Sequence, residues 1–388
     1  MELTKCKLGE LITQRREKND GSDLPICGVS KDGLIPPKQI DADTSIYNVF
    51  YRDDFIFNPA RMELNSIAIN DKYDRAICSS LYEVFYVHRT DLLLPHFLKL
   101  IVKQPWFTRY CEFLGQGSAR EYCRFNNISE IEIEFPSLEE QEKIVNQYSA
   151  IQNRIAIKKQ INDNLEATAQ AIFKSLFIDY EGAECTDFIE FEFGKYPASW
   201  NLVELDSVVD VRDGTHDSPS PTESGKYLIT SRHLLPYAID RSDAYFISEA
   251  DFKKANERSK VEYGDILFSM IGTIGIISFI TDKEIDFAIK NVGLFRTSQN
   301  PTTRYFILSY LKSKIVENYI ASYMAGSTQS YVSLNVLRKI PLILPTEDVL
   351  QHFEKQVTPL YAKMIENTHE ITKLNVLKDV ITTSMSSR

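Results

Sequence analysis

The sequence lacks the short patterns from which most metal and nucleotide sites are built. Its six cysteines include no Cys-x-x-Cys pair, and its six histidines include no His-Glu-x-x-His pair, so no zinc-ligand spacing is present. A Gly-x-x-x-x-Gly-Lys-Ser/Thr loop, which would hold the phosphates of a nucleotide, is also missing. We therefore expect neither a metal nor a cofactor, and no motor driven by a nucleoside triphosphate.

Long apolar runs are scarce as well. The most apolar stretch, residues 266–280, is shorter than the ~20 residues of a membrane-spanning helix and is interrupted by Gly272 and Gly275. We interpret it as a pair of buried strands. Since Met1 to Lys5 also lack the apolar core of a signal peptide, we expect a cytoplasmic protein with reduced cysteines and no membrane partner.

The charge balance is acidic. The 388 residues carry 44 basic and 54 acidic side chains, a formal net charge of −10. Taken alone, this charge argues against a nucleic-acid partner, because phosphate binding needs positive charge. A basic surface can nevertheless coexist with an acidic chain, and partner subunits would then help to hold DNA. The length is sufficient for two or three domains, and the 43% hydrophobic content is that of a folded protein.

One internal repeat organises the sequence. The Gly-Ser pair at residues 117–118 recurs at residues 326–327, a shift of 209 positions, and each pair lies nineteen residues before a proline, Pro136 or Pro345. Under the same shift, further residues meet an identical residue: Phe97, Tyr110, Tyr122, Asn126 and Ile131 fall on Phe306, Tyr319, Tyr331, Asn335 and Ile340. A slightly different shift matches Asp54-Phe55-Ile56-Phe57 with Asp265-Ile266-Leu267-Phe268. The chain is therefore predicted to contain two copies of one unit.

Each of these prolines precedes a long stretch with the pattern of a helix. In the first copy, Ser137 stands before Glu139 and Glu140, as an N-terminal cap would, and no proline or glycine follows until Gly182. Mostly apolar residues then recur at spacings of four and three, at residues 144, 148, 151, 155, 158, 162, 165, 169, 172 and 176 and at the positions 209 residues later. We predict two helices of about 40 residues, each roughly 60 Å long.

Two arrangements of these helices are compatible with the stripes. The helices can pair antiparallel as a coiled coil that joins two similar globular domains in a pseudo-two-fold repeat, or each helix can pack on its own globular domain. We favour the coiled coil, because a long exposed apolar seam is unstable alone. The predicted fold class is α+β, with the first globular domain at residues 1–136, the first helix at 137–181, the second domain at 182–345 and the second helix at 346–388.

The globular domains should mix helices and strands. Short apolar runs at residues 67–69, 82–87 and 342–344 are typical of strands. Residues 95–113 and 303–323 have the patterns of helices.

These features resemble the specificity subunit of Type I restriction-modification systems. Several stretches carry the resemblance: Gly117-Ser118 followed by Asn126 and Ile131-Glu132-Ile133-Glu134-Phe135-Pro136, the helix start Pro136-Ser137-Leu138-Glu139-Glu140-Gln141, and the segments Asn58-Pro59-Ala60-Arg61 and Asp213-Gly214-Thr215-His216. The order domain, helix, domain, helix spans the whole chain. The second copy departs from the pattern, because residues 345–350 lack the Glu-Glu-Gln run and the segment at Asp213 has no counterpart in the first domain.

The resemblance implies a non-catalytic subunit that reads double-stranded DNA. In the family, each globular domain, called a target recognition domain, recognises one half of a split target. The helices set the gap between the halves and dock two methyltransferase subunits. Adenine methylation and, where restriction subunits join, translocation and cleavage of DNA belong to those other chains. We expect the same partners here.

Two other functions are compatible with parts of the sequence. The run Phe113-Leu114-Gly115-Gln116-Gly117 fits the methyl-donor loop of DNA amino-methyltransferases, but it ends a predicted helix and the second copy lacks it. Asn58-Pro59-Ala60-Arg61 lacks the second proline and the aromatic residue of their catalytic segment. A free-standing methyltransferase is therefore disfavoured. A duplicated coiled-coil scaffold that binds proteins and not DNA is the main alternative.

Candidate DNA contacts lie on loops between apolar elements, where binding residues concentrate. Arg, Lys, Asn and Gln suit contacts to bases, and small hydroxyls serve as adaptable donors. The candidates in the first domain are Lys31, Lys38, Arg61, Asn65, Arg120 and Arg124. Those in the second domain are Thr215, His216, Ser231, Arg232, His233, Lys290 and Gln329. A side chain that only faces solvent explains each single residue equally well, so the prediction applies to the set; no catalytic residue is predicted.

Overall fold

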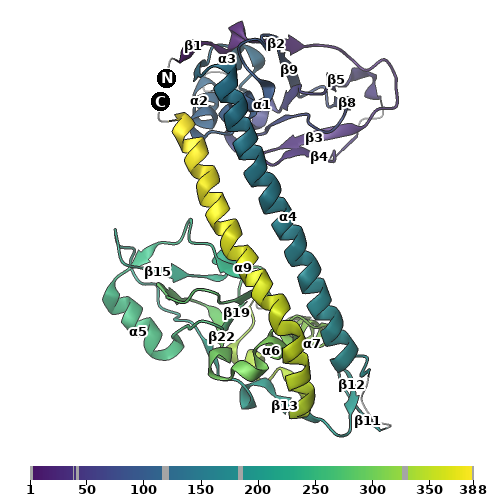
Figure 1. Cartoon of the computed structure of the whole chain (residues 1–388), viewed down its shortest axis with the longest axis vertical. Helices are drawn as coiled ribbons and strands as arrows, with labels where there is room; N and C mark the ends of the chain where they lie inside the picture. Colours follow the sequence, from purple (N-terminus) through teal and green to yellow (C-terminus); the bar gives the residue numbers. More distant parts are fainter. Residues whose placement is uncertain are drawn as a thin grey trace. The chain divides into compact units, whose positions relative to one another are not determined.

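The computed structural model describes residues 3–37, 39–40, 43–115, 122–181, 187–325 and 331–386. The chain divides into two compact units: unit 1 contains residues 1–155 and 373–388, and unit 2 contains residues 156–372. Two long helices therefore contribute to both units (Figure 1). Each unit combines a globular α+β part with segments of these helices.

Unit 1 is built on two four-stranded sheets. The first has the strand order β2-β9-β6-β7, at Ile12–Arg15, Glu83–Val87, Phe55–Phe57 and Ile67–Ile69. The second has the order β4-β3-β8-β5, at Gly33–Ile35, Ile26–Ser30, Arg75–Cys78 and Asn48–Tyr51, with β3 parallel to β8. A separate antiparallel pair joins β1 (Thr4–Lys7) to β10 (Glu132–Phe135). Strand β10 alternates exposed glutamates with buried Ile133 and Phe135, as expected for a strand with one face on the core.

Unit 2 repeats this plan. Its four-stranded sheet has the order β14-β22-β19-β20, at Val211–Asp213, Val292–Phe295, Ile266–Ser269 and Ile277–Phe279. Its three-stranded sheet has the order β18-β15-β21, at Phe246–Ile247, Lys226–Ile229 and Phe287–Ile289, with β15 parallel to β21. The pair β13 (Asn201–Glu204) and β23 (Pro341–Leu344) matches the pair β1 and β10. Equivalent strands occupy equivalent places, so the predicted duplication is confirmed in the topology.

The most apolar stretch of the sequence lies in this sheet. Strands β19 and β20 pair antiparallel, and all residues of β19 are buried. The prediction of paired buried strands at residues 266–280 is therefore confirmed. Unit 2 also has elements with no counterpart among the described residues of unit 1: the hairpins β11–β12 (Phe188–Phe191 and Gly194–Pro197) and β16–β17 (Leu234–Leu235 and Ala238–Ile239), and helix α5 (Glu249–Ser259).

The helices follow the repeat closely. In unit 1, α1 is Pro95–Val102, α2 is Pro105–Gly115 and α3 is Phe125–Ser129. Helices α6 (Arg304–Leu311), α7 (Lys314–Ala325) and α8 (Leu334–Arg338) of unit 2 each start 209 residues later. Short 3-10 helices lie at Leu8–Glu10 (η1), Thr44–Ile46 (η2), Pro59–Leu64 (η3), Leu205–Ser207 (η4), Ser231–His233 (η5), Thr297–Gln299 (η6) and Pro301–Thr303 (η7). Residues 95–113 and 303–323 each form two helices instead of one predicted helix. Pro105 starts α2 in the first copy, whereas Lys314 starts α7 in the second.

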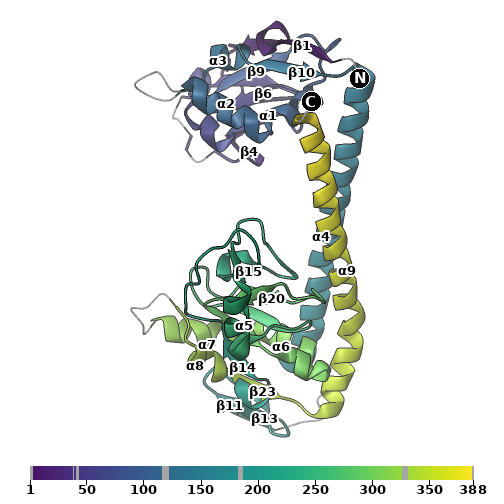
Figure 2. The ribbon, with the colours of Figure 1, turned by 90° about the vertical axis from the view of Figure 1, so that its left-hand side faces the viewer.

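The long helices α4 (Leu138–Phe177) and α9 (Glu347–Ser386) have 40 residues each and start 209 residues apart. Within unit 2 they run antiparallel and side by side (Figures 1 and 2). Lys158 of α4 forms an ion pair with Glu370 of α9 at 2.7 Å, whereas Phe177, further along α4, packs against Phe353 near the start of α9. The predicted antiparallel coiled coil is thus confirmed.

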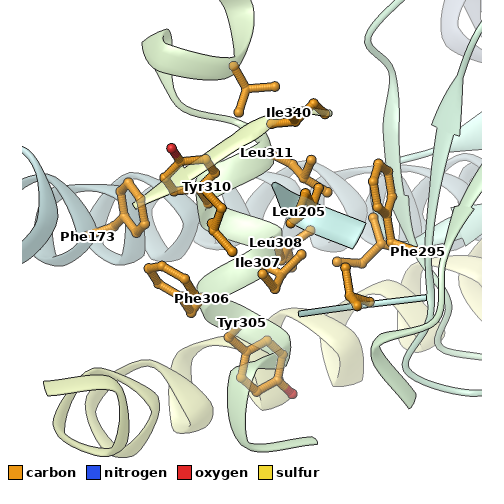
Figure 3. Close-up of a cluster of buried hydrophobic side chains, with 14 of the residues drawn as sticks. Phe173, Leu205, Phe295, Tyr305, Phe306, Ile307, Leu308, Tyr310, Leu311 and Ile340 are labelled. Atoms are coloured by element: carbon orange, nitrogen blue, oxygen red, sulfur yellow. The ribbon is translucent and has the colours of Figure 1, made fainter. Parts of the chain in front are cut away.

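The same helices also pack on the globular part of unit 2. Figure 3 shows Phe173 of α4 beside Phe306 and Tyr310 of α6, with Leu205 and Ile340 in the same cluster. Phe306 is fully buried, and Phe173 is 2% exposed. Coiled coil and globular core are therefore continuous in unit 2, so the two predicted helix arrangements are not exclusive.

Candidate nucleic-acid interface

The segment Asp213-Gly214-Thr215-His216 lies where β14 ends. A Cβ atom on Gly214 would lie 2.4 Å from the carbonyl oxygen of Ile289, so only glycine permits this close approach to β21. The approach lets Thr215 form a parallel bridge with Lys290, the residue after β21. Three predicted contact residues, Thr215, His216 and Lys290, are therefore brought together from distant parts of the sequence.

A network of polar side chains surrounds this meeting point. His216, exposed on the surface, has Nδ1 2.8 Å from Asn291 Oδ1 and Nε2 3.1 Å from Asp213 Oδ2. The carboxylate of Asp213 is 3% exposed and also accepts a hydrogen bond from Arg258. The Lys290 ammonium donates to the hydroxyl of Ser218. The buried carboxylate thus orients an exposed imidazole and an exposed guanidinium side by side.

Helix α5 supplies cations that the sequence reading missed. Arg258 is half-exposed, and Lys254, one turn earlier, pairs with Asp217 at 2.9 Å. Lys254 also lowers the pKa of Asp217. The spacing of four residues within a polar helical run, which places both cations on one helix face, was the available signal. Only the fold brings that face to the loop after β14.

The second predicted cluster, residues 231–233, forms the helix η5. His233 is 1% exposed; its Nδ1 accepts from the Thr230 backbone N–H at 2.9 Å, and its Nε2 lies 3.1 Å from Asp243 Oδ1. Burial lowers the pKa of His233. Ser231 is half-buried, whereas Arg232 is exposed and lies 3.5 Å from Asp243. Arg232 therefore faces solvent, whereas His233 connects η5 to Thr230 and Asp243.

In unit 1, Arg61 and Arg124 lie on neighbouring segments. The backbone N–H of Cys123 donates to the Pro59 carbonyl at 3.0 Å, which ties the segment before α3 to η3. Both arginines are exposed. Arg124 lies 3.6 Å from Glu83. Unit 2 has the equivalent hydrogen bond, in which the backbone N–H of Val332 donates to the Met270 carbonyl.

The remaining predicted residues of unit 1 differ in their placement. Asn65 has φ +52° and its amide donates to Val102 O at 2.7 Å and Thr108 Oγ1 at 2.8 Å, so it ends η3 and anchors it to α2. Lys31 is exposed in the turn between β3 and β4, and its carbonyl accepts a hydrogen bond from Lys103 Nζ at 2.7 Å, which also donates to Ile67 O. The predicted contacts Lys38, Arg120 and Gln329 lie outside the described residues.

None of the helices in the described ranges is long and apolar enough to cross a membrane. In the part of the chain that the structure describes, no group of three or more His, Cys, Asp or Glu side chains is arranged to hold a metal ion.

Two similar α+β units with long helices shared between them define a class of internally duplicated proteins, and exposed cations lie on the loops of both units. The model of the Type I restriction modification DNA specificity domain matches residues 6–167 and again residues 197–375. These matches cover most of the chain, and the chain therefore belongs to this family. Specificity subunits are non-catalytic components of restriction-modification systems, and this chain is one of them.

Individual relatives agree with this assignment. The specificity subunit of the Type I restriction enzyme MjaIX from Methanocaldococcus jannaschii is 27% identical over 308 residues, which cover 75% of this chain and 68% of that protein. The HindI specificity subunit from Haemophilus influenzae is 20% identical over 379 residues, 81% of each chain. The fold is similar to the crystal structure of a Type I S subunit from M. genitalium, with a TM-score of 0.60 and 15% identity over 99% of this chain and 96% of that one.

Proposed function

We propose that the chain recognises a split double-stranded DNA target and directs methyltransferase subunits to it. The target recognition domains are residues 1–136 and 182–345, and the helices at 137–181 and 346–388 set the gap between the two half-sites. The duplication itself supports this proposal most. Both units share one order of strands in a four-stranded sheet and a parallel strand pair in the second sheet, whereas unit 2 has two hairpins and helix α5 without a counterpart among the described residues of unit 1. A shared scaffold with different loops is suited to reading two different sequences.

The proposed DNA contacts in the first domain are the exposed cations Lys31, Arg61 and Arg124. In the second domain they are Thr215, His216, Arg232 and Lys290, to which we add Lys254 and Arg258. Arginine and lysine on such loops can contact base edges and phosphates. Asn65, Ser231 and His233 support the loops in this proposal, and Lys38, Arg120 and Gln329 stay in it as predicted contacts.

The proposed partners are DNA, two methyltransferase subunits and, where present, restriction subunits, all in the cytoplasm. The long helices carry exposed apolar side chains that suit a docking role: Ile157 and Ile161 on α4, and Val376, Leu377 and Val380 on α9. Exposed apolar groups that gather on one element typically mark protein interaction sites. We propose adenine as the methylated base.

The decisive experiment is methylome sequencing of a host that expresses the chain with its candidate methyltransferase subunit. A host that expresses the methyltransferase subunit alone is the control. The proposal predicts modified adenines in one split motif, present only with this chain. Without any chain-dependent motif, from a partner that is active and bound, the proposal fails and the protein-binding scaffold becomes the better account.

A deletion tests the role of the helices separately. Removing one heptad from α4 and one from α9 keeps the phase of the apolar stripe. At 1.5 Å per residue the helices shorten by roughly 10 Å, which corresponds to about three base pairs. The methylated motif should keep both half-sites and change the gap between them, whereas an unchanged gap would show that the helices do not set it.

A further inference from the structure

A groove of about 170 Å³ opens in unit 1 between α1, β10, the start of α4 and the end of α9. Its lining from α1 and α4 is apolar and includes Phe97, Ile101 and Ile144, and the half-buried indole of Trp106 stands beside them. Polar groups such as Gln147 also line it. An apolar floor with polar groups beside it is the usual composition of a protein docking site.

The equivalent place in unit 2 is filled. A shift of 209 residues carries Phe97 and Ile144 to Phe306 and Phe353. There, two rings near the end of α4 pack against both: the Phe173 centroid lies 6.1 Å from Phe306 and 6.0 Å from Phe353, and the Phe177 centroid lies 4.9 Å and 5.1 Å from them. Both rings are 2% exposed. Figure 3 shows Phe173 turned toward Phe306.

In unit 1, the residues that correspond to these two rings are small and polar. The same shift carries Phe173 to Thr382 and Phe177 to Ser386 on α9. Thr382 donates its hydroxyl to the α9 backbone at Asp379 O, at 3.0 Å. The side chains of α9 that line the groove are Ile381 and Met385, and neither is aromatic. The groove therefore lies beside the residues whose equivalents in unit 2 pack against two aromatic side chains.

We propose that this groove of unit 1 receives an amphipathic helix of another protein in the complex, with two aromatic side chains one turn apart. Its two rings take the part that Phe173 and Phe177 play in unit 2, and they contact Phe97, Ile144 and Trp106 beside the end of α9. Aromatic anchors in a preformed pocket typically dominate helix-in-groove recognition. The statement that the helix belongs to another subunit rests on the function proposed above, whereas the binding of such a helix in the groove does not.

The chain itself supplies the first probe, a synthetic peptide of residues 166–180 that contains Phe173 and Phe177. The full chain labelled with 5-fluorotryptophan has two reporters, Trp106 in the groove and Trp200 in the core of unit 2. We expect the peptide to shift the Trp106 signal saturably and leave Trp200 unchanged. A peptide with both phenylalanines replaced by alanine should bind at least tenfold more weakly. The absence of a saturable Trp106 shift, or equal binding of both peptides, overturns the proposal.

A second test fills the groove with a side chain of the protein itself, and it has a matched control. Thr382→Phe adds a ring where unit 2 has Phe173, and it should abolish peptide binding. Thr383→Phe makes the same substitution at the next, exposed position of α9, outside the groove lining, and should leave peptide binding intact. In the full complex, Thr382→Phe should lower the amount of bound partner subunit at least tenfold relative to Thr383→Phe. If Thr382→Phe binds the peptide as well as the parent protein does, the groove is not the binding site. Neither assay contains DNA, so the outcome does not depend on recognition of the DNA target.

Discussion

Glu354 joins the start of α9 to the start of α6. Its Oε1 accepts hydrogen bonds from the backbone N–H groups of Tyr305 and Phe306, both at 2.9 Å. In unit 1 the start of α1 is held by the neutral Gln141, whose Oε1 accepts from Leu94 N at 2.9 Å. The first N–H groups of a helix have no partner within it. The two units therefore hold the starts of equivalent helices with side chains of different charge, at different backbone N–H groups.

This difference gives unit 2 a pH dependence. Burial raises the pKa of Glu354 to about 7 from an ordinary value of 4.5. Between these values the folded protein holds a proton that the unfolded chain has released, so the free energy of unfolding falls as the pH rises from 4.5 through about 7. Glu354→Gln keeps the acceptor oxygen and removes the titration. We expect this variant to be more stable than the parent protein above pH 7, by on the order of 1–3 kcal/mol, with a difference that shrinks toward pH 5.

Urea denaturation across this pH range measures the effect. The matched control is Glu366→Gln on the same helix, where Lys363 lowers the pKa of an exposed carboxylate. The control should show no gain above pH 7. A parallel pH profile of Glu354→Gln and the parent protein would contradict the assignment.

The two predicted DNA-contact histidines of unit 2 should separate stability from binding. His233→Ala removes the acceptor of the part-buried Thr230 N–H and the partner of Asp243, so we expect a loss of about 1–3 kcal/mol in the free energy of unfolding. His216→Ala changes an exposed side chain and should alter stability by less than about 0.5 kcal/mol, while it weakens DNA binding. Urea denaturation measures the stability of both variants, and a titration with DNA measures their binding. If His216→Ala lost more stability and His233→Ala lost more DNA binding, the roles of the two histidines would be the reverse of those assigned.

At the scale of elements, the long helices were the most predictable part of the chain. Each position of the predicted stripe in α4, from residue 144 to residue 176, is buried or half-buried. The stripe does not include Phe173 and Phe177, because they lie beside it and face the globular part of unit 2. A seam with a heptad period is a local signal, whereas packing on a distant sheet is not. This is why the sequence predicts the helix pair and misses the rings that anchor it.

The coiled coil contains a polar layer within unit 2. Asn367 is fully buried; its amide donates to Asn162 Oδ1 at 2.8 Å, and its Oδ1 accepts from Lys158 Nζ at 2.9 Å. Asn367→Leu removes the partner of both groups and should lower the free energy of unfolding by about 1–3 kcal/mol. Replacing Asn162 and Asn367 together by leucine removes both amides, keeps the ion pair between Lys158 and Glu370 and should restore or exceed the original stability. Thermal denaturation compares the variants, and a double variant less stable than Asn367→Leu would contradict this account.

At the scale of the molecule, the repeat could be predicted from the sequence because a few identical residues keep the same spacing in both copies, although most other residues differ. The positions of the loops were not readable in the same way. Thr215, just after β14, meets Lys290 in a parallel bridge, and such a bridge joins segments that are distant in sequence. The cations of α5 could be found as a helix face, but not as neighbours of Thr215. Loop contacts of this kind depend on tertiary pairing and not on local pattern.

The net charge of −10 makes a further demand on the whole chain. An acidic protein that grips phosphates must concentrate its cations, so each cation of a true contact cluster should count in the salt dependence of binding. We expect Lys254→Ala with Lys290→Ala to weaken DNA binding for all sequences alike and to reduce the slope of log affinity against log salt by about 1 per lysine. Lys253→Ala with Lys283→Ala removes the same charge from exposed positions outside the cluster and is the control. Equal slopes for the two double variants would mean that the loop after β14 and helix α5 do not contact DNA, and the grip of the second domain would then have to lie on another face.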